Sequence, residues 1–331
     1  MRFVIIGALG SMGRRRIRNL KALGHTDLIG YDIVDRKKAN PDCWYTDMLD
    51  EVECFLKNLT DGYPGVVDAI IVSVPPLQKQ KYIDLGNKYH VPVFCEADVT
   101  EYSGNYYSSA TMRHHSAVQK IKELLDNGTL GKIYTFNYQM GQSLYDWHPG
   151  ANMKTYYAAQ KDSGACREMF CFELSWLSYL FGTPIDAKGM IDKKLNDPDI
   201  QADDVYSAAV KFEETEWIAA GLCKDKSITG TILVDIVSRP AIRELRIVGE
   251  KGTLKWNWND DHIKLEHPSG VILPISYDRG KAAEGYHSAI CEQMYQNELQ
   301  NFINAIQGKS QYLFSKEDEK AVMNMLNKIE T

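Results

Sequence analysis

Short apolar runs alternate with amphipathic segments along the first hundred residues. Four runs are almost wholly apolar, as expected of strands that are buried on both faces of a sheet. They are residues 1–6, 28–31, 66–74 and 91–95. Between them, apolar positions recur at helical spacing, which predicts a helix after residue 13 and further helices over residues 48–59 and 78–87. This alternation predicts an α/β unit built on a parallel sheet.

The connection after residue 95 departs from this alternation. Parallel strands are usually joined by a dozen or more residues that include a helix. Residues 96–109 provide the length, but glycine, asparagine and serine make them a poor helix former. We therefore expect the usual helix to be missing or reduced to a turn. Residues 110–115 are predicted to be the last strand of this unit, and residues 116–127 a helix with an apolar stripe.

From Gly131 onward the pattern becomes that of an antiparallel sheet accompanied by helices. Residues 132–140 alternate like a half-exposed strand, and residues 168–181 form a strongly apolar helix. Seven further segments are predicted strands, namely residues 205–212, 217–222, 227–238, 242–248, 252–258, 262–266 and 271–275. Two terminal helices, residues 292–306 and 316–329, are candidates for packing back on the first domain. We predict an α+β second domain over residues 116–331, after a first domain over residues 1–115.

Three glycines, Gly7, Gly10 and Gly13, stand between the first strand and its helix, and Asp32 ends the second strand. Glycines in such a turn let backbone N–H groups approach a diphosphate, and the helix N-terminus adds positive potential. An acid about 20 residues further on accepts hydrogen bonds from the adenosine ribose. Strand, turn, helix and acid together predict a Rossmann domain that binds a dinucleotide cofactor.

Cofactor contacts are predicted at the carboxyl edge of the sheet, where ligands bind in open α/β sheets. The predicted set is Gly7, Gly10, Ser11, Met12, Gly13, Asp32, Ser73, Val74, Pro75, Pro76, Glu96 and Asp98. Asp32 repels a 2′-phosphate, so NAD is favoured. The basic residues 36–38 leave NADP possible, although a solvated loop is the interpretation that we prefer. Of the three arginines at residues 14–16, one can help to neutralise the diphosphate, but all three cannot face it.

Composition narrows the class of partner. A chain of 331 residues is too long for one ordinary core, and its net charge of −6 argues against a nucleic-acid or anionic-membrane partner. No apolar run reaches the length of a transmembrane helix. Seven scattered cysteines without a CxxC pair, and a beginning without a signal peptide, predict a cytoplasmic protein with reduced thiols. No cluster has metal-ligand spacing, so we predict no metal.

Eight segments, in order and spacing, resemble the glucose–fructose oxidoreductase / inositol dehydrogenase / MocA (Gfo/Idh/MocA) family. They are residues 5–20, 69–76, 93–98, 112–134, 141–149, 172–182, 245–256 and 298–309. The resemblance implies an N-terminal Rossmann domain and a C-terminal domain with a large open, mostly antiparallel sheet. It also implies NAD(P)-dependent oxidation or reduction of sugars, nucleotide sugars, polyols or related carbonyl compounds, by homodimers or homotetramers formed through that sheet.

The chain departs from this family at the residues that transfer protons in the reaction. The Glu-Lys-Pro of the family is here Glu96–Ala97–Asp98, and the usual aspartate and histidine correspond to Met169 and Phe172. Oxidising an alcohol by hydride transfer leaves a proton that some group must accept, and positioned help is worth roughly 10²–10⁴-fold in rate. Either other residues supply that help, or the chemistry is not ordinary dehydrogenation.

His148 and Glu168 are the candidates for this proton transfer. His148 lies in a loop where members of the family contact substrate, with a backbone-bonding role as an equal alternative. For Glu168 the alternative, which we favour, is a structural role, in which its carboxylate interacts with the positive end of the helix dipole. Substrate contacts are predicted for Arg113, Tyr145, Trp147 and Tyr156.

The resemblance therefore implies an oxidoreductase acting on the CH–OH group of a small, carbohydrate-like substrate. Two alternatives stay open. One is an epimerase or lyase that uses bound NAD without net redox change, and the other is a cofactor-binding pseudoenzyme that acts as a partner or sensor.

Overall fold

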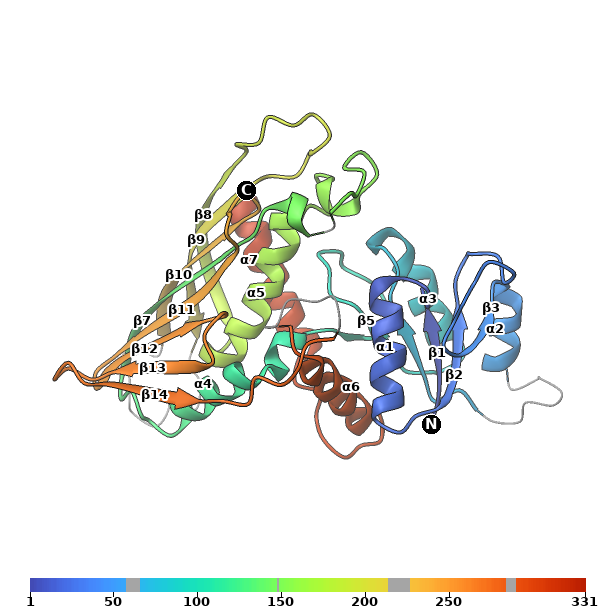
Figure 1. The fold of residues 1–331 in the computed structure, drawn as a ribbon, viewed down its shortest axis with the longest axis horizontal. Coiled ribbons are helices and arrows are strands. Elements are labelled where there is room, and N and C mark those ends of the chain that lie inside the picture. The colour runs from blue at the N-terminus through green and yellow to red at the C-terminus, as the bar shows by residue number, and fades with distance from the viewer. Residues whose placement is uncertain (58–65, 148, 214–226, 284–289) are drawn as a thin grey trace. The chain divides into compact units, whose positions relative to one another are not determined.

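A computed structural model describes residues 1–57, 66–147, 149–213, 227–283 and 290–331 of the chain (Figure 1). The chain forms two compact units. Unit 1 comprises Met1–Thr111 and Glu292–Lys316, and unit 2 comprises Met112–Cys291 and Glu317–Thr331. The first division thus falls at Thr111 rather than at the predicted residue 115, and the helix that starts at Glu292 belongs to unit 1.

Unit 1 is built on a six-stranded parallel sheet in the order β3-β2-β1-β4-β5-β6. The strands are β1 (Arg2–Ile6), β2 (Asp27–Tyr31), β3 (Trp44–Thr46), β4 (Ala69–Val72), β5 (Val93–Cys95) and β6 (Tyr107–Ser108). Every residue of β1 and β4 is buried, which explains why these strands read as unbroken apolar runs. The order reverses between β2 and β4 on either side of β1, so a ligand crevice is expected at the carboxyl ends of these strands.

Helices cover both faces of this sheet. They are α1 (Ser11–Ala22), α2 (Leu49–Leu56), α3 (Pro76–Lys88) and α6 (Glu292–Ile306). One core cluster joins side chains of α2 and α3 to one face, and a second joins α1 and α6 to the other. The sequence predicted these helices to within a few residues but missed the short strand β3.

The crossover from β5 to β6 contains no helix, as predicted: residues 96–106, all of which the structure describes, form turns and loops. The strand predicted over residues 110–115 is wrong. The strand at that edge is β6, and the 3₁₀ helix η1 (Thr111–His114) follows it. The sequence pattern here, one buried apolar residue, Met112, between polar neighbours, fits a short strand and a single helical turn equally well.

Unit 2 contains an eight-stranded sheet in the order β14-β13-β12-β11-β7-β10-β9-β8. The strands are β7 (Ile133–Gly141), β8 (Pro184–Asp192), β9 (Val205–Glu213), β10 (Ser227–Asp235), β11 (Ile242–Gly249), β12 (Gly252–Asn257), β13 (His262–Glu266) and β14 (Ile272–Ser276). All neighbours are antiparallel except β7 and β10. The sequence missed β8, and the strand predicted over residues 217–222 lies outside the described residues.

Helices α4 (Ser116–Asp126) and α5 (Ala165–Phe181) lie along one face of this sheet (Figure 1). All residues of α7 (Lys316–Glu330) except the first also belong to unit 2. Alternate side chains of β7 show the two faces: Phe136 and Tyr138 are buried, whereas Asn137 between them is exposed. The predicted combination of an α/β domain and an α+β domain with a large, mostly antiparallel sheet is confirmed.

Candidate functional site

The glycine turn between β1 and α1 is closed on one side and open on the other. Gly7 has φ +79°, and a Cβ there would lie 2.4 Å from the carbonyl oxygen of Ser73. A Cβ at Gly13 would lie 2.1 Å from the carbonyl oxygen of Gly7. These two glycines are required by backbone packing. A Cβ at Gly10 would meet the Gly7 oxygen at 3.3 Å, a tight contact that needs a small shift, and the Ser73 oxygen at 4.0 Å. Gly10 is exposed, and the space for a side chain there is much less restricted than at Gly7 and Gly13.

The N-terminus of α1 has the electrostatics of an anion site. Gly10 is its N-cap residue, no side chain caps the helix, and its first turn contains no acidic residue. The helix therefore begins with backbone N–H groups and the positive end of its dipole beside a residue without a side chain. A diphosphate group fits this cradle, because it brings negative charge and several acceptor oxygens.

Asp32 follows β2 and lies beside this turn. Its carboxylate accepts hydrogen bonds from the N–H groups of Leu9, at 3.1 Å, and Ile33, at 2.8 Å. The turn and the acid are also joined through Tyr31, whose carbonyl oxygen accepts from the N–H groups of Gly7 and Ala8. An ionised carboxylate has about four acceptor sites, so Asp32 retains capacity for ribose hydroxyls. The structure thus brings the predicted glycines and acid together at one edge of the sheet.

The three arginines of α1 have different surroundings. Arg14 is exposed and donates to the carbonyl oxygen of Leu9, which places it beside the turn. Arg15 pairs with Glu292 at 3.0 Å, and Arg16 is fully buried. Only Arg14 is therefore positioned to approach a bound anion. Among the basic residues 36–38, the Arg36 guanidinium is already engaged by Asp47, Glu51 and Thr46.

Glu96 and Asp98, predicted to bind cofactor, use their carboxylates inside unit 1. Arg16 binds Glu96 through two hydrogen bonds of 2.7 Å, and Ser73 donates to it at 3.1 Å. Burial is the largest single influence and acts to raise the pKa of Glu96. The charge and hydrogen bonds of Arg16, the charge of Lys79 and the hydrogen bond from Ser73 together outweigh burial, so this pKa is lowered. Asp98 forms an almost completely buried ion pair with Lys79, whose ammonium also donates to the Glu96 carbonyl oxygen at 2.6 Å. These carboxylates hold the turn after β5 in place.

The same buried network extends to α6. Glu298 is fully buried and accepts hydrogen bonds from Arg16 at 2.8 Å, from the Ser109 hydroxyl at 2.8 Å and from the Thr111 hydroxyl at 2.9 Å. The backbone N–H of Ala110 donates to it as well, at 2.7 Å. One arginine therefore ties the helix of the glycine turn to the ends of β5 and β6 and to α6.

Sequence reasoning missed these ion pairs, although a signal was present. Arg16 precedes Leu20 by four positions, Lys79 precedes Ile83 by four, and Glu298 precedes Phe302 by four. Each charge therefore falls on the apolar stripe of its helix. A charge on such a stripe that is not at a helix end indicates a buried ion pair, because an unpaired charge there would be too costly.

In unit 2 the structure brings Glu168 close to Tyr156. Glu168 is in the first turn of α5, and Tyr156 precedes the 3₁₀ helix η3 (Tyr157–Ala159). Burial raises the pKa of the Tyr156 phenol, and the nearby charge of Glu168 raises it further. His148, the other candidate for proton transfer, lies outside the described residues.

The remaining predicted substrate residues are bound by other partners. Tyr145 is at the surface and donates to Asp197 at 2.6 Å, while Trp147 donates from its indole to the Gln142 carbonyl oxygen. Arg113 is 3% exposed and is bound by the Ser175 carbonyl, the Ser178 hydroxyl and Asp318. The guanidinium of Arg113 thus serves the packing of η1 against α5 and α7.

The two positions of α5 that correspond to the acid and the histidine implied by the resemblance carry Met169 and Phe172, which have no ionisable group. Met169 and Phe172 are half-buried, and the next residue on that face, Ser175, donates its hydroxyl back to the Phe172 carbonyl. The described residues include no group of three histidines, cysteines or acids able to hold a metal ion. None of the described helices is both long enough and apolar enough to cross a membrane.

Comparison with solved structures shows what this architecture is similar to. An oxidoreductase from Agrobacterium radiobacter, in complex with NAD⁺, L-tartaric acid and magnesium, shares 12% identity with a TM-score of 0.73 over 100% of this chain and 95% of that one. For levoglucosan dehydrogenase in complex with NADH, the identity is 12% and the TM-score is 0.74, over 100% of this chain and 96% of that one. UDP-N-acetylglucosamine 3-dehydrogenase from Acidithiobacillus ferrooxidans shares 13% identity with a TM-score of 0.69, over 100% of this chain and 96% of that one. The comparison with curated proteins gave no match.

Fold and site define the class of two-domain proteins that join a Rossmann domain to an open-sheet α+β domain. Within it, residues 118–255 match the GFO/IDH/MocA C-terminal domain. This match, which covers less than half of the chain, agrees with the resemblance stated from the sequence.

Proposed function

We propose that the protein is an NAD(P)-dependent oxidoreductase that acts on the CH–OH group of a sugar, nucleotide sugar or related polyol. The observation that carries the proposal is the cradle at Gly10, where an open backbone turn, a helix N-terminus without an acid and the Asp32 carboxylate meet. Three similar structures support the same cofactor and substrate class: an oxidoreductase in complex with NAD⁺, levoglucosan dehydrogenase with NADH, and UDP-N-acetylglucosamine 3-dehydrogenase.

The residues present fit a nicotinamide dinucleotide. The N–H groups at the start of α1 would hold its diphosphate, Arg14 would add positive charge at the rim, and Asp32 would accept from the adenosine ribose. When bound, the cofactor supplies a hydride acceptor or donor. This chain must then hold the substrate hydroxyl and accept its proton.

Glu168 and Tyr156 are the described residues proposed for that proton. A carboxylate is a competent base, and a phenol close to it can orient the substrate hydroxyl or pass on its proton. The raised pKa of Tyr156 keeps the phenol protonated at neutral pH, so it acts as a hydrogen-bond donor. His148 remains a second candidate for the same role.

The proposal is tested by incubating the protein with NAD⁺ or NADP⁺ and a panel of sugars, nucleotide sugars and polyols, and following reduced cofactor. With an accepted substrate, Glu168→Gln is expected to lower kcat by roughly 10²-fold or more, because it removes the base. Tyr156→Phe is expected to lower kcat less. Glu123→Gln, at an exposed position of α4 paired with Lys120, is the control and should leave kcat unchanged. Substrate turnover without reduced cofactor would contradict net dehydrogenation, and full activity of Glu168→Gln would remove Glu168 from the reaction.

Cofactor preference gives a separate prediction. Asp32→Ser is expected to weaken NAD⁺ binding by about 10–100-fold, because each hydrogen bond to a charged group is worth about 1.5–3 kcal/mol. NADP⁺ binding should improve relative to NAD⁺, since the repulsion of a 2′-phosphate is removed. Titration of both cofactors measures the change. Asp35→Ser, which alters an exposed acid in the same loop, is the matched control. An unchanged ratio of the two affinities would remove Asp32 from the ribose site.

We further propose that copies of the chain associate through the open face of the unit 2 sheet. Exposed apolar side chains on this face include Met190, 76% exposed, on β8 and Ile272, 56% exposed, on β14. Packing a second copy on the face would remove this apolar surface from water.

A further inference from the structure

Unit 1 contains a second hollow, which the proposed function does not use. Its volume is about 850 Å³, within the range of about 300–1,000 Å³ that is usual for small-molecule sites. All residues that line it belong to unit 1. Val91 and Val93 line it where β5 begins, whereas Glu96 follows the other end of that strand. The hollow therefore lies at the amino edge of the sheet, and the cradle at Gly10 lies at the carboxyl edge.

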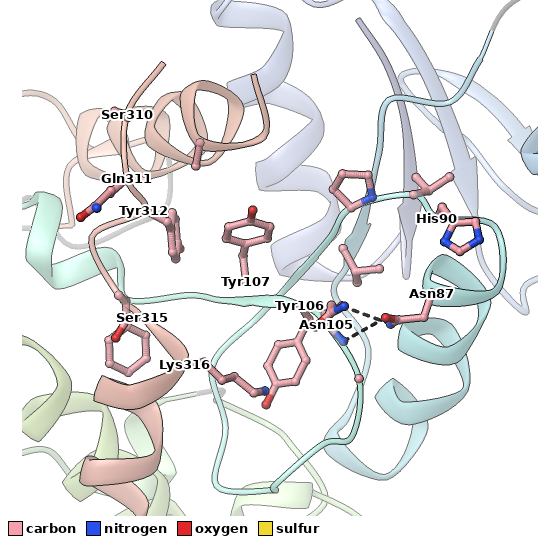
Figure 2. A pocket seen from close by; sticks show the side chains of 16 residues that line it. Asn87, His90, Asn105, Tyr106, Tyr107, Ser310, Gln311, Tyr312, Ser315 and Lys316 are labelled. Carbon is pink, nitrogen blue, oxygen red and sulfur yellow. Dashed lines mark hydrogen bonds between the residues drawn. The ribbon is translucent and has the colours of Figure 1, made fainter. Parts of the chain in front are cut away.

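The hollow follows from the unusual crossover between β5 and β6. A helix normally packs beside such an edge strand, but residues 96–106 form only turns and loops. The wall is instead made by the end of α3, by residues 104–107 and by the segment at 310–316 (Figure 2). A short connection thus leaves room that a helix would otherwise fill.

Aromatic rings form a firm part of this wall. Tyr107 packs edge-on against Tyr312, with ring centroids 5.3 Å apart, and against Phe302 of the core. The Tyr312 hydroxyl donates to the Ser108 carbonyl at 2.9 Å, which fixes that ring. Rings held in this way offer apolar surface to a flat ligand ring at little entropic cost, because they are ordered before the ligand arrives.

The polar part of the wall is basic or neutral. Asn87 is held by two hydrogen bonds to the backbone of Asn105, at 2.9 and 3.1 Å, which pin loop and helix together (Figure 2). Lys316 lies with its ammonium 3.1 Å from the centroid of the Tyr106 ring, and His90 lies at the far side. None of the sixteen residues that line the hollow is acidic. Its charge therefore favours an anionic ligand over a cationic one.

We propose that this hollow is a second small-molecule site, which binds a flat ring that carries an anionic group. Tyr107 and Tyr312 provide the surface for the ring, and Lys316 provides the charge for a phosphate or a carboxylate. The proposal does not depend on the reaction proposed above.

The test is calorimetric titration of the full-length protein with phenyl phosphate and with benzoate, which share a ring but differ in the anion. Phenol has the ring without the anion, and inorganic phosphate has the anion without the ring. Each should bind more weakly than phenyl phosphate or benzoate. Lys316→Met is expected to weaken binding of both probes by about tenfold or more, because it removes a charge-assisted contact. Lys316→Arg should retain most of the affinity. Gly10→Val, which blocks the other edge of the sheet, should leave it unchanged.

Four results would overturn the proposal: no binding of either probe at millimolar concentration, equal binding by Lys316→Met and the unaltered protein, loss of binding in Gly10→Val, or competition by NAD⁺. The last two would assign the probe to the cradle at Gly10. Should Lys316→Met fail to fold, crystals of the unaltered protein with 4-bromophenyl phosphate decide the question through the anomalous signal of bromine. Bromine beside Tyr107 and Tyr312 supports the site, and bromine elsewhere refutes it.

Discussion

Replacing Gly10 by valine is expected to abolish dinucleotide binding while leaving unit 1 folded. Gly10 has φ −67°, which any residue adopts, and a Cβ there needs only a shift of a few tenths of an ångström from the Gly7 carbonyl oxygen, 3.3 Å away. An isopropyl group there would occupy the space that a diphosphate needs above the first turn of α1. Loss of two charge-assisted hydrogen bonds, worth about 1.5–3 kcal/mol each, corresponds to at least about 100-fold weaker binding. Calorimetric titration with NAD⁺ and NADP⁺ measures the affinity.

Gly13→Val is the informative contrast. Any Cβ at residue 13 strikes the Gly7 backbone, so this variant should lose both binding and stability. Circular dichroism of the two variants separates the effects. If Gly10→Val binds the dinucleotide as tightly as the unaltered protein, the glycine turn is only a packing device. If Gly10→Val unfolds, the open geometry assigned to residue 10 is wrong.

Replacing Arg16 by methionine is expected to cost about 3–5 kcal/mol of unfolding free energy, the usual result of removing one partner from a buried ion pair. Arg16 is fully buried and is shared by Glu96 and Glu298, so its loss leaves two carboxylates in one low-dielectric region. Urea unfolding followed by circular dichroism measures the change. Because the chain has two units, the transition of unit 1 must be fitted separately.

Arg18→Met on the same helix is the matched control for this prediction. Arg18 is exposed, and its guanidinium is 4.0 Å from Glu292, so the expected cost is below about 1 kcal/mol. Equal costs for Arg16→Met and Arg18→Met would show that the buried network does not stabilise unit 1.

The pH dependence of stability gives a second view of the same network. The pKa of Glu96 is lowered in the folded state, because the charges and hydrogen bonds of its partners, chiefly Arg16, together outweigh burial. A carboxyl group whose pKa is lower in the folded protein than in the unfolded chain stabilises the fold at any pH above its unfolded pKa, about 4.3. This stabilisation is lost as the pH falls through the folded pKa. The difference between the unaltered protein and Arg16→Met should therefore shrink below about pH 4.

The predictions from sequence succeeded where a pattern depends on local geometry. The first β-α-β unit, the helix-free crossover and most strands of unit 2 follow from apolar periodicity and from the glycine and proline positions. The segment over residues 110–115 failed because one turn of 3₁₀ helix and a short strand bury the same kind of residue. Strand β3 was missed because three residues at a sheet edge carry too little periodicity.

The site was harder to predict than the fold, because pairing across the structure decides what a charge does. Arg113, Glu96 and Asp98 have the chemistry of ligand-binding residues, yet each is bound by partners far away in sequence. The placement of the glycines beside Asp32 was predictable because it depends on a turn, a helix start and a strand end that lie within one short segment. Only the tertiary structure shows which charges remain available for a ligand.

A crystal structure of the protein soaked with NAD⁺ tests the central claim most directly. The account predicts one dinucleotide in unit 1, with its diphosphate over Gly10 on the N–H groups at the start of α1 and its adenosine ribose against Asp32. Unliganded protein at saturating NAD⁺ and NADP⁺, or a nucleotide bound away from this turn, would contradict it.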